Sequence, residues 1–175
     1  MLTFEALRET GLAAGLDALG ACSADPFLGT RETLQERKAE GLHGSMQFTY
    51  RNPVRSTDPE ASMAGAQTLI VAACSYHREP PPKPVGVGPV AQVARYVWAD
   101  DQERLLAGLE VVAELLRTAG HGAAVLSDQN NLVDRAVAER AGLGWYGKNA
   151  NLLLPGRGSW FILGSVLTDA GSEAI

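Results

Sequence analysis

The chain has 175 residues, of which 46% are hydrophobic and 20% are charged, and its formal net charge is −5 at pH 7. This composition is typical of a globular protein that buries a core without disulfides or structural metals. The negative net charge and the scattered Lys and Arg residues argue against this chain by itself forming a nucleic-acid-binding surface. They still allow a local basic patch on the folded protein.

The cysteines and the apolar runs exclude further classes of protein. Cys22 and Cys74 are the two cysteines, and without a CxxC pair they can build neither a zinc knuckle nor an iron–sulfur cluster. We interpret both as unreactive core thiols in a reducing compartment. The N-terminus shows no signal-peptide pattern, and no apolar run is long enough to cross a bilayer. The sequence therefore predicts one cytoplasmic domain, residues 1–175, that does not contact a membrane.

Apolar spacing and capping residues predict the elements of the first half of the chain. In chain order these are a helix over Thr3–Ala14, a strand over Asp17–Ser23, a helix over Thr30–Glu40, a short helix over Asp58–Met63 and a strand over Thr68–Ser75. The last segment, TLIVAACS, is almost entirely apolar, so we expect it to be buried on both faces of a sheet.

The second half begins with a segment, residues 79–90, that holds five of the nine prolines. It predicts a stiff surface loop, with a proline-rich ligand for a partner as the alternative. The elements predicted after it are a helix over Asp101–Ala119, a strand over Ala123–Leu126, a helix over Asn131–Ala141 and a strand over Trp160–Thr168. Strands that alternate with helices predict an α/β or α+β sandwich. We expect both long apolar strands in its sheet and the long helix packed on it.

Chemistry-bearing residues concentrate between residues 127 and 164. Asp128 follows a predicted strand, and the glycine-rich loops GLGWYGKN and PGRGSW come next. Glycines let the backbone approach a ligand closely, and an acid at a strand end is a frequent catalytic position. Asp128 can equally be a helix N-cap, Lys148 a solvated cation, and Trp145 and Trp160 core residues rather than ligand platforms. The GxGxxG spacing follows a helix rather than a strand, so it does not indicate a dinucleotide site.

Four blocks, in the right order, resemble the epoxyqueuosine reductase family. They read GLHGSMQFTYRNPVRSTDPEASMAGAQTLIVAACSYH, ARYVWADDQERLL, SDQNNLVDRAVAERAGLGWYGKN and RGSWFILG. The resemblance implies a cobalamin-dependent oxidoreductase on a flavin-reductase/nitroreductase-like scaffold. Such an enzyme reduces epoxyqueuosine to queuosine in tRNA, so its implied partners are that tRNA and an electron-donor protein.

The resemblance also implies roles for individual residues. It makes Asp128 the proton donor, with Asp134 as a rival acid that we interpret as a helix-terminal charge paired with Arg135 or the helix dipole. The residues implied to hold cobalamin are Arg51, Gly147, Lys148, Asn149, Leu152, Ser159 and Leu163. The mutase-type signature Asp-x-His-x-x-Gly is absent around all three histidines, so the resemblance implies a base-off cofactor with no protein ligand to the metal.

Two departures from the family pattern bear on function. Where the family has RYxRGRDYH, this chain reads RYVWADDQER, so Gln102 and Glu103 replace a Tyr-His pair. The sequence stops at Ile175, where the family continues into its 4Fe-4S region. We therefore expect a truncated piece or a natural orphan domain, which is inactive unless its cobalamin is reduced artificially. The alternative is a stand-alone cobalamin- or flavin-binding domain without reductase activity.

Overall fold

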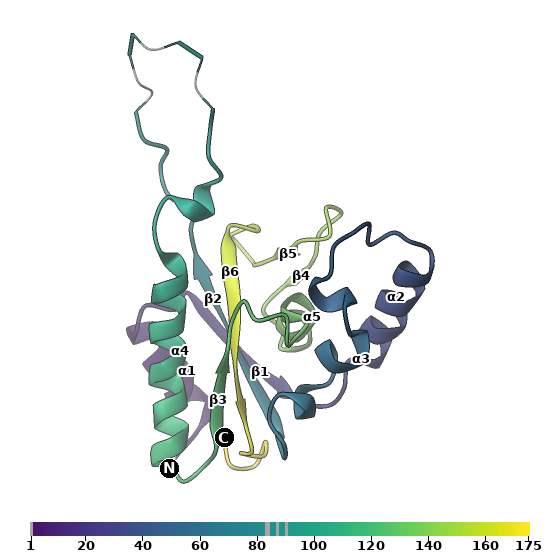
Figure 1. Ribbon diagram of the computed structural model, residues 1–175. Coiled ribbons are helices and arrows are strands. Elements are labelled where there is room, and N and C mark those ends of the chain that lie inside the picture. The colour runs from purple at the N-terminus through teal and green to yellow at the C-terminus, as the bar shows by residue number, and fades with distance from the viewer. Residues whose placement is uncertain (1, 83–84, 87, 90) are drawn as a thin grey trace.

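The computed structural model describes residues 2–82, 85–86, 88–89 and 91–175 (Figure 1). At its centre is a four-stranded sheet in the order β1-β2-β6-β3, in which every neighbouring pair is antiparallel. Its strands are β1 (Ala18–Ser23), β2 (Thr68–Ser75), β3 (Ala123–Leu126) and β6 (Phe161–Thr168). A second, two-stranded sheet pairs β4 (Trp145–Tyr146) with β5 (Leu152–Leu153). The antiparallel pairing makes the fold α+β rather than a doubly wound α/β sheet.

Helices cover both faces of the four-stranded sheet (Figure 1). The helix α1 (Phe4–Ala13) and the long helix α4 (Asp101–Thr118) pack on one face. The other side carries α2 (Leu28–Ala39), α3 (Pro53–Ser56) and α5 (Asp134–Arg140). Short 3-10 turns lie at Phe48–Tyr50, Pro59–Ala61 and Arg95–Val97. Among the described helices, none combines the length and the apolar character needed to cross a membrane.

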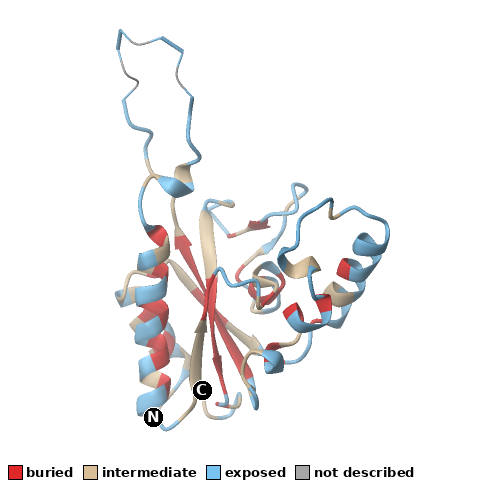
Figure 2. Cartoon of the chain, in the orientation of Figure 1, coloured by how far each residue is buried: buried red, intermediate tan, exposed pale blue. Residues whose placement is uncertain are grey.

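The strand β2 forms the centre of both cores. Its residues Leu69, Val71 and Ala73 pack into the core beneath α5, and the alternate residues Ile70, Ala72 and Cys74 pack into the core beneath α1 and α4. Successive side chains of a strand point to opposite faces, so both faces are apolar only when both are covered. Figure 2 shows this central strand and the inner side of α4 as buried. The predicted burial of Thr68–Ser75 is confirmed, as is the packing of the long helix on the sheet.

Element boundaries differ from the sequence predictions where local interactions outweigh periodicity. The helix predicted from Thr30 begins at Leu28, and the helix predicted from Asn131 begins at Asp134. The short helix predicted over 58–63 is a 3-10 turn at Pro59–Ala61, in which Asp58 accepts a hydrogen bond from the amide of Glu60. The β4–β5 pair was not predicted, because strands of two residues show no periodicity.

The proline-rich segment 79–90 is only partly within the described residues. Residues 83–84, 87 and 90 lie outside them, and the others are exposed, as expected for a surface loop. In Figure 1 the described residues of this segment, here named the projecting loop, extend away from the body of the molecule above the start of α4.

Both cysteines should resist thiol reagents in the folded protein. Cys74 is fully buried in β2, and the half-buried Cys22 directs its sulfur toward the carbonyl oxygen of Val137 at 3.9 Å. Burial raises the pKa of each thiol to about 11. At pH 8 the reactive thiolate is then on the order of one in a thousand molecules. We expect Ellman's reagent to titrate neither thiol in the folded chain and both in guanidinium. Rapid reaction of the folded chain would contradict the packing of β1 on β2.

Candidate functional site

A cavity of about 440 Å³, here named the Asp128 cavity, lies where the turn after β3, the β5 strand and the start of β6 meet. It is lined by Tyr76, Tyr96, Gln102, Asp128, Asp134, Arg135, Asn151, Leu152, Ser159, Phe161, Ile162 and Leu163. Four of the residues singled out in the sequence, Asp128, Leu152, Ser159 and Leu163, therefore share one cavity. They come from the turn after β3, from β5, from the segment before β6 and from β6 itself.

The backbone of Asp128 is in the left-handed region, with φ of 53°. Non-glycine residues adopt this conformation rarely, Asp and Asn most readily among them, and such positions gather at functional sites. The helix α5 starts only at Asp134, and its N-cap is Val133, which makes no side-chain capping bond. The interpretation of Asp128 as a helix cap is therefore wrong. Its side chain is exposed to the cavity instead.

The turn that carries Asp128 is held from α4. The side-chain amide of Gln102 donates a hydrogen bond of 2.6 Å to the hydroxyl of Ser127, which is only 8% exposed. Ser127 fits there because Gly164 on β6 has no side chain, and a Cβ at Gly164 would lie 3.2 Å from the Ser127 hydroxyl oxygen. In the sequence, Gln102 stands out only as a departure from the family pattern. The structure makes it a cavity wall and a support for the Asp128 turn.

A buried carboxylate fixes the start of α4 opposite this turn. Asp101 is 4% exposed and accepts two hydrogen bonds from the guanidinium of Arg78, at 2.9 and 2.8 Å. Arg104 donates a further bond of 3.3 Å to the same carboxylate. Arg78 follows the segment that brings Tyr76 into the Asp128 cavity. Bidentate Arg–carboxylate pairs fix orientation as well as distance, so this pair holds the two walls of the cavity in register.

Three other predicted cofactor residues lie outside the cavity lining. Gly147, Lys148 and Asn149 form the turn between β4 and β5, where Lys148 is exposed. The amide of Gly147 donates to the carbonyl of Asn151 at 2.8 Å, and the Asn149 side chain accepts from the amide of Asn151 at 3.2 Å. The turn thus shapes the hairpin that presents Asn151 and Leu152 to the cavity.

Arg51 also lies apart from the Asp128 cavity. It is exposed after the 3-10 turn at 48–50, and its carbonyl oxygen accepts a hydrogen bond of 3.3 Å from Lys38. Its neighbours Thr49 and Tyr50 line a second cavity, of about 840 Å³, between α2, the 46–50 segment and the start of α5. Asp134 and Arg135 line both cavities, so the two spaces share a wall.

Asp134 sits in this shared wall as the first residue of α5. Burial raises its pKa to about 6, the negative charge of Asp128 adds to this shift, and its own backbone hydrogen bond and Arg135 oppose it. The predicted place at the helix start is confirmed. Of the two predicted partners, Arg135 makes no hydrogen bond to Asp134, because its guanidinium donates to the carbonyl of Ala150 at 2.6 Å. The other predicted partner, the positive end of the helix dipole, lies at Asp134 because this residue begins α5.

Replacing Asp134 with Asn should stabilise the protein at pH 7. Its pKa rises from 3.8 to about 6, so the folded chain binds more protons than the unfolded chain between these values. Below about pH 4 Asp134 is protonated in both states and does not destabilise the folded chain. As the pH rises through 6 its ionisation favours the unfolded chain, because the buried carboxylate is less stable than the solvated one. At pH 7 the variant should gain about 1–3 kcal/mol in the free energy of unfolding. Urea unfolding at both pH values measures this, and an equal gain at pH 4 would contradict the cause.

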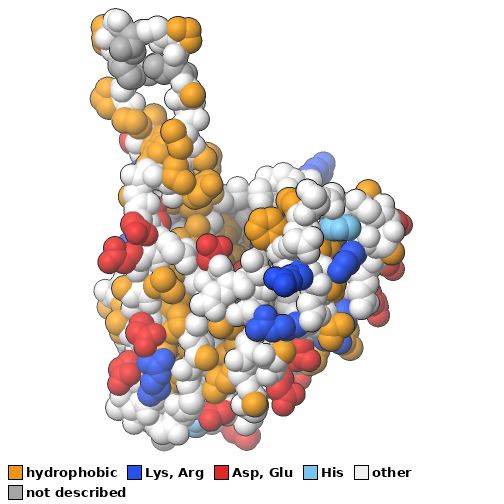
Figure 3. All heavy atoms as spheres, viewed as in Figure 1, with side chains coloured by type: hydrophobic (Ala, Val, Ile, Leu, Met, Phe, Trp, Pro, Cys, Tyr) orange, Lys and Arg blue, Asp and Glu red, His pale blue; other side chains and the backbone are white. Residues whose placement is uncertain are grey.

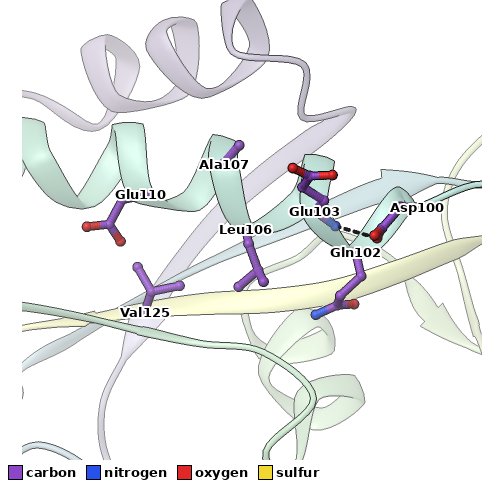
Figure 4. A pocket seen from close by; sticks show the side chains of 7 residues that line it. All are labelled: Asp100, Gln102, Glu103, Leu106, Ala107, Glu110 and Val125. Atoms are coloured by element: carbon purple, nitrogen blue, oxygen red, sulfur yellow. Dashed lines mark hydrogen bonds between the residues drawn. The ribbon is translucent and has the colours of Figure 1, made fainter.

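A third cavity, of about 590 Å³, runs between α4 and β3. Figure 4 shows Leu106 and Val125 pointing toward each other across it, with Asp100 accepting a hydrogen bond from the amide of Glu103. None of the glycine-loop residues lines this cavity, and among the described lining residues Gln102 alone is shared with the Asp128 cavity. It therefore offers no arrangement for chemistry comparable with the Asp128 cavity. Within the described part of the chain, no three His, Cys, Asp or Glu side chains are placed to hold a metal ion.

A local basic surface exists despite the negative net charge. Lys and Arg side chains gather over the side of the molecule formed by α2, α3 and α5 (Figure 3). These helices carry Arg31, Arg37, Lys38, Arg55, Arg135 and Arg140. Arg55 also donates a hydrogen bond of 2.7 Å to Asn131, which follows the Asp128 turn. The basic side is thus connected with the loop that forms one wall of the cavity.

Comparison with known proteins finds relatives along almost the whole chain, although no protein-family model matches it. An epoxyqueuosine reductase of Synechococcus sp. (strain CC9605) is 31% identical over 94% of this chain and 51% of its own length. The structure of epoxyqueuosine reductase from Streptococcus thermophilus superposes with a TM-score of 0.88 and 25% identity, covering 98% of this chain and 47% of that one.

Two further structures share the fold. An epoxyqueuosine reductase with an epoxyqueuosine-modified stem loop of tRNA-Tyr has a TM-score of 0.85 and 25% identity, over 94% of this chain and 44% of that one. A reductive dehalogenase, described for B12-dependent dehalogenation, has a TM-score of 0.54 and 23% identity, over 94% of this chain and 19% of that one, and shows the fold alone. The chain is therefore a homologue of the epoxyqueuosine reductases over nearly all of its own length, and it spans about half the length of these relatives.

Proposed function

We propose that this chain is the cobalamin-binding and proton-donating part of an oxidoreductase that reduces epoxyqueuosine to queuosine in tRNA. The observation that carries the proposal is the position of Asp128, on a left-handed turn that faces Leu152, Ser159 and Leu163 across one cavity. The epoxyqueuosine reductases among its relatives support the reaction, and the one bound to a tRNA stem loop supports the substrate class.

The residues around the two adjoining cavities fit a large, flat, amide-rich cofactor. The Asp128 cavity offers apolar surface from Leu152 and Leu163 and polar groups from Asn151 and Ser159. Ligand sites of this kind combine mostly apolar walls with a few polar groups that set orientation. Among the described residues that line either cavity there is no histidine, so these walls hold no imidazole for the metal.

Cobalamin would therefore lie against Leu152 and Leu163, with its amides near Ser159, Asn151 and Arg135. When bound, it would supply the electrons that break the carbon–oxygen bonds of the epoxide, and an electron-donor protein would replace them.

The proton chemistry falls to Asp128. Removal of an epoxide oxygen as water, which leaves a double bond, consumes two electrons and two protons. An alkoxide is a poor leaving group, so a positioned general acid lowers the barrier to its departure. The Asp128 carboxyl would hold a proton at the cavity and deliver it to the departing oxygen. The Gln102–Ser127 hydrogen bond would keep the turn, and with it this carboxyl, in place.

A visible absorption titration tests the cofactor assignment. The purified chain is titrated with cob(II)alamin and, separately, with flavin mononucleotide. We expect a saturable change in the corrin bands with one equivalent bound, and no change in the flavin spectrum. Binding of the flavin alone would select a flavin-binding domain on the same scaffold. Binding of neither compound would exclude the proposed cofactor.

A further inference from the structure

We propose that a partly exposed cluster of four aromatic side chains and one arginine, at the mouth of the Asp128 cavity, is a stacking platform for an unpaired nucleobase. Its members are Tyr76, Arg95, Tyr96, Trp98 and Trp160, here named the aromatic rim. The base would belong to a nucleotide that neighbours the one entering the cavity. The identity of the RNA as a tRNA stem loop rests on the proposed function, whereas the stacking surface itself does not.

The aromatic rim is assembled from three segments that are distant in sequence. Tyr76 follows β2 and Trp160 precedes β6. Arg95 and Tyr96 belong to the 3-10 turn at Arg95–Val97, and Trp98 comes directly after it. The guanidinium carbon of Arg95 lies 4.7 Å from the ring centroid of Trp160 and 5.5 Å from that of Trp98. The arginine is thus held against two indole rings, an arrangement that aligns a cation with flat aromatic surfaces.

Tyrosines connect this stack to the cavity. The ring of Tyr76 meets Trp160 edge-on at 6.0 Å and Tyr96 edge-on at 6.4 Å between centroids. Tyr76 and Tyr96 both line the Asp128 cavity. The aromatic rim and the cavity therefore form one continuous surface. An RNA strand that places one nucleotide in the cavity would pass a neighbouring nucleotide over the aromatic rim.

Two members of the aromatic rim are exposed, whereas Tyr76, Arg95 and Trp98 are half-buried. Trp160 is 41% exposed and Tyr96 is 58% exposed, so the interpretation of Trp160 as a core residue is wrong. Figure 3 shows hydrophobic side chains gathered where the projecting loop joins the body. Grouped exposed aromatic residues are uncommon on proteins without a partner for them.

Charge and shape favour RNA as that partner. Within the described residues, no carboxylate lies within 4.0 Å of the Arg95 guanidinium, so its charge is available to a phosphate. Unpaired bases of RNA loops are recognised by stacking on aromatic rings and on arginine planes, with cations at the backbone. The basic side over α2, α3 and α5 lies beyond the cavity and would continue the phosphate path.

The test measures the fluorescence anisotropy of a dye-labelled, unmodified tRNA-Tyr anticodon stem loop of about 17 nucleotides. The stem loop is titrated with the full chain, with and without cobalamin. We expect Trp160→Leu and Tyr96→Leu each to weaken binding about 5- to 150-fold, which is the effect of losing one stacked base. The control is Trp145→Leu, which removes a tryptophan that is 53% exposed on β4, outside the aromatic rim. In the titration without cobalamin, that variant should bind the stem loop as the wild type does. Arg95→Gln should reduce the salt slope by roughly 0.7 per phosphate contact.

Two results would overturn the proposal. One is no binding of the stem loop by the wild-type chain under either condition. The other is wild-type affinity in both Trp160→Leu and Tyr96→Leu, which would show that no base stacks on the aromatic rim. A fully paired duplex of the same composition should bind more weakly and respond to none of these substitutions. If the stem loop binds as expected but cobalamin does not, the aromatic rim stands while the proposed function fails.

Discussion

Replacing Asp128 with Asn is expected to lower single-turnover reduction of epoxyqueuosine by roughly 10²–10⁴-fold, the usual contribution of a general acid. The reaction is measured with the cobalamin-loaded chain after chemical reduction of the cofactor, so it needs no electron-donor protein. An amide cannot deliver the proton that the departing oxygen requires. Cobalamin binding should remain within about twofold, since Asn differs little from Asp in size and removes no apolar contact.

The choice of Asn separates chemistry from folding. The backbone of Asp128 has a φ of 53°, which Asn adopts about as readily as Asp, whereas Ala would add strain to the turn. The control is Asp25→Asn, which removes an exposed carboxylate in the turn before α2. We expect that variant to react at the wild-type rate. A wild-type rate for Asp128→Asn would end the proton-donor assignment, and equal losses in both variants would point to a general effect of charge.

Replacing Gly144 with Ala is expected to weaken cobalamin binding by more than about tenfold. The added methyl group would collide with the backbone of β5 and prevent the present pairing of β4 with β5. A Cβ at Gly144 would lie 2.0 Å from the carbonyl oxygen of Leu153 and 2.8 Å from its carbonyl carbon. Backbone atoms cannot move aside as a flexible side chain can, so the hairpin has to separate or shift. Leu152, which is 2% exposed and lines the Asp128 cavity, would move with it.

The matched control for this change is Gly88→Ala. Gly88 lies in the exposed loop, and a Cβ there would meet nothing within 4 Å. Its stability and its cobalamin affinity should match those of the wild type. Urea unfolding distinguishes a local shift of the hairpin from a loss of global stability. A local shift would cost more binding free energy for cobalamin than free energy of unfolding, both relative to the wild type. Unchanged cobalamin binding in Gly144→Ala would show that the hairpin does not form part of the cofactor site.

The arrangement of the two acids in the cavity assigns them different tasks. Asp128 is exposed to the cavity on a turn, whereas Asp134 is anchored at the start of α5 and half-buried in the wall between two cavities. The raised pKa of Asp134 has burial as its main cause and the charge of Asp128 as a lesser one. Removing the charge of Asp128 should therefore lower the pKa of Asp134 slightly. The reduction rate of the Asp134→Asn variant shows whether the Asp134 carboxyl contributes to the reaction at all.

The sequence by itself determined the elements with strong periodicity. The apolar run of β2 and the amphipathic stripe of α4 identify a buried strand and its covering helix, since burial on these faces requires that spacing. The ordered blocks around Asp128 likewise identified the family relationship and the cavity residues Leu152, Ser159 and Leu163. These features are local, because each depends on residues within one or two adjacent elements.

Only the tertiary structure decided which of these residues meet. The strand order β1-β2-β6-β3 pairs residues far apart in the chain, such as Ser75 with Phe161, and no local pattern specifies that pairing. The exposure of Trp160, the support of Ser127 by Gln102 and the burial of Asp134 all follow from it. The turn role of Gly147–Asn149 depends likewise on the β4–β5 hairpin, whose two-residue strands are too short for a sequence pattern to reveal. Burial and pKa are set by what covers a side chain in space, and that covering comes from other segments of the chain.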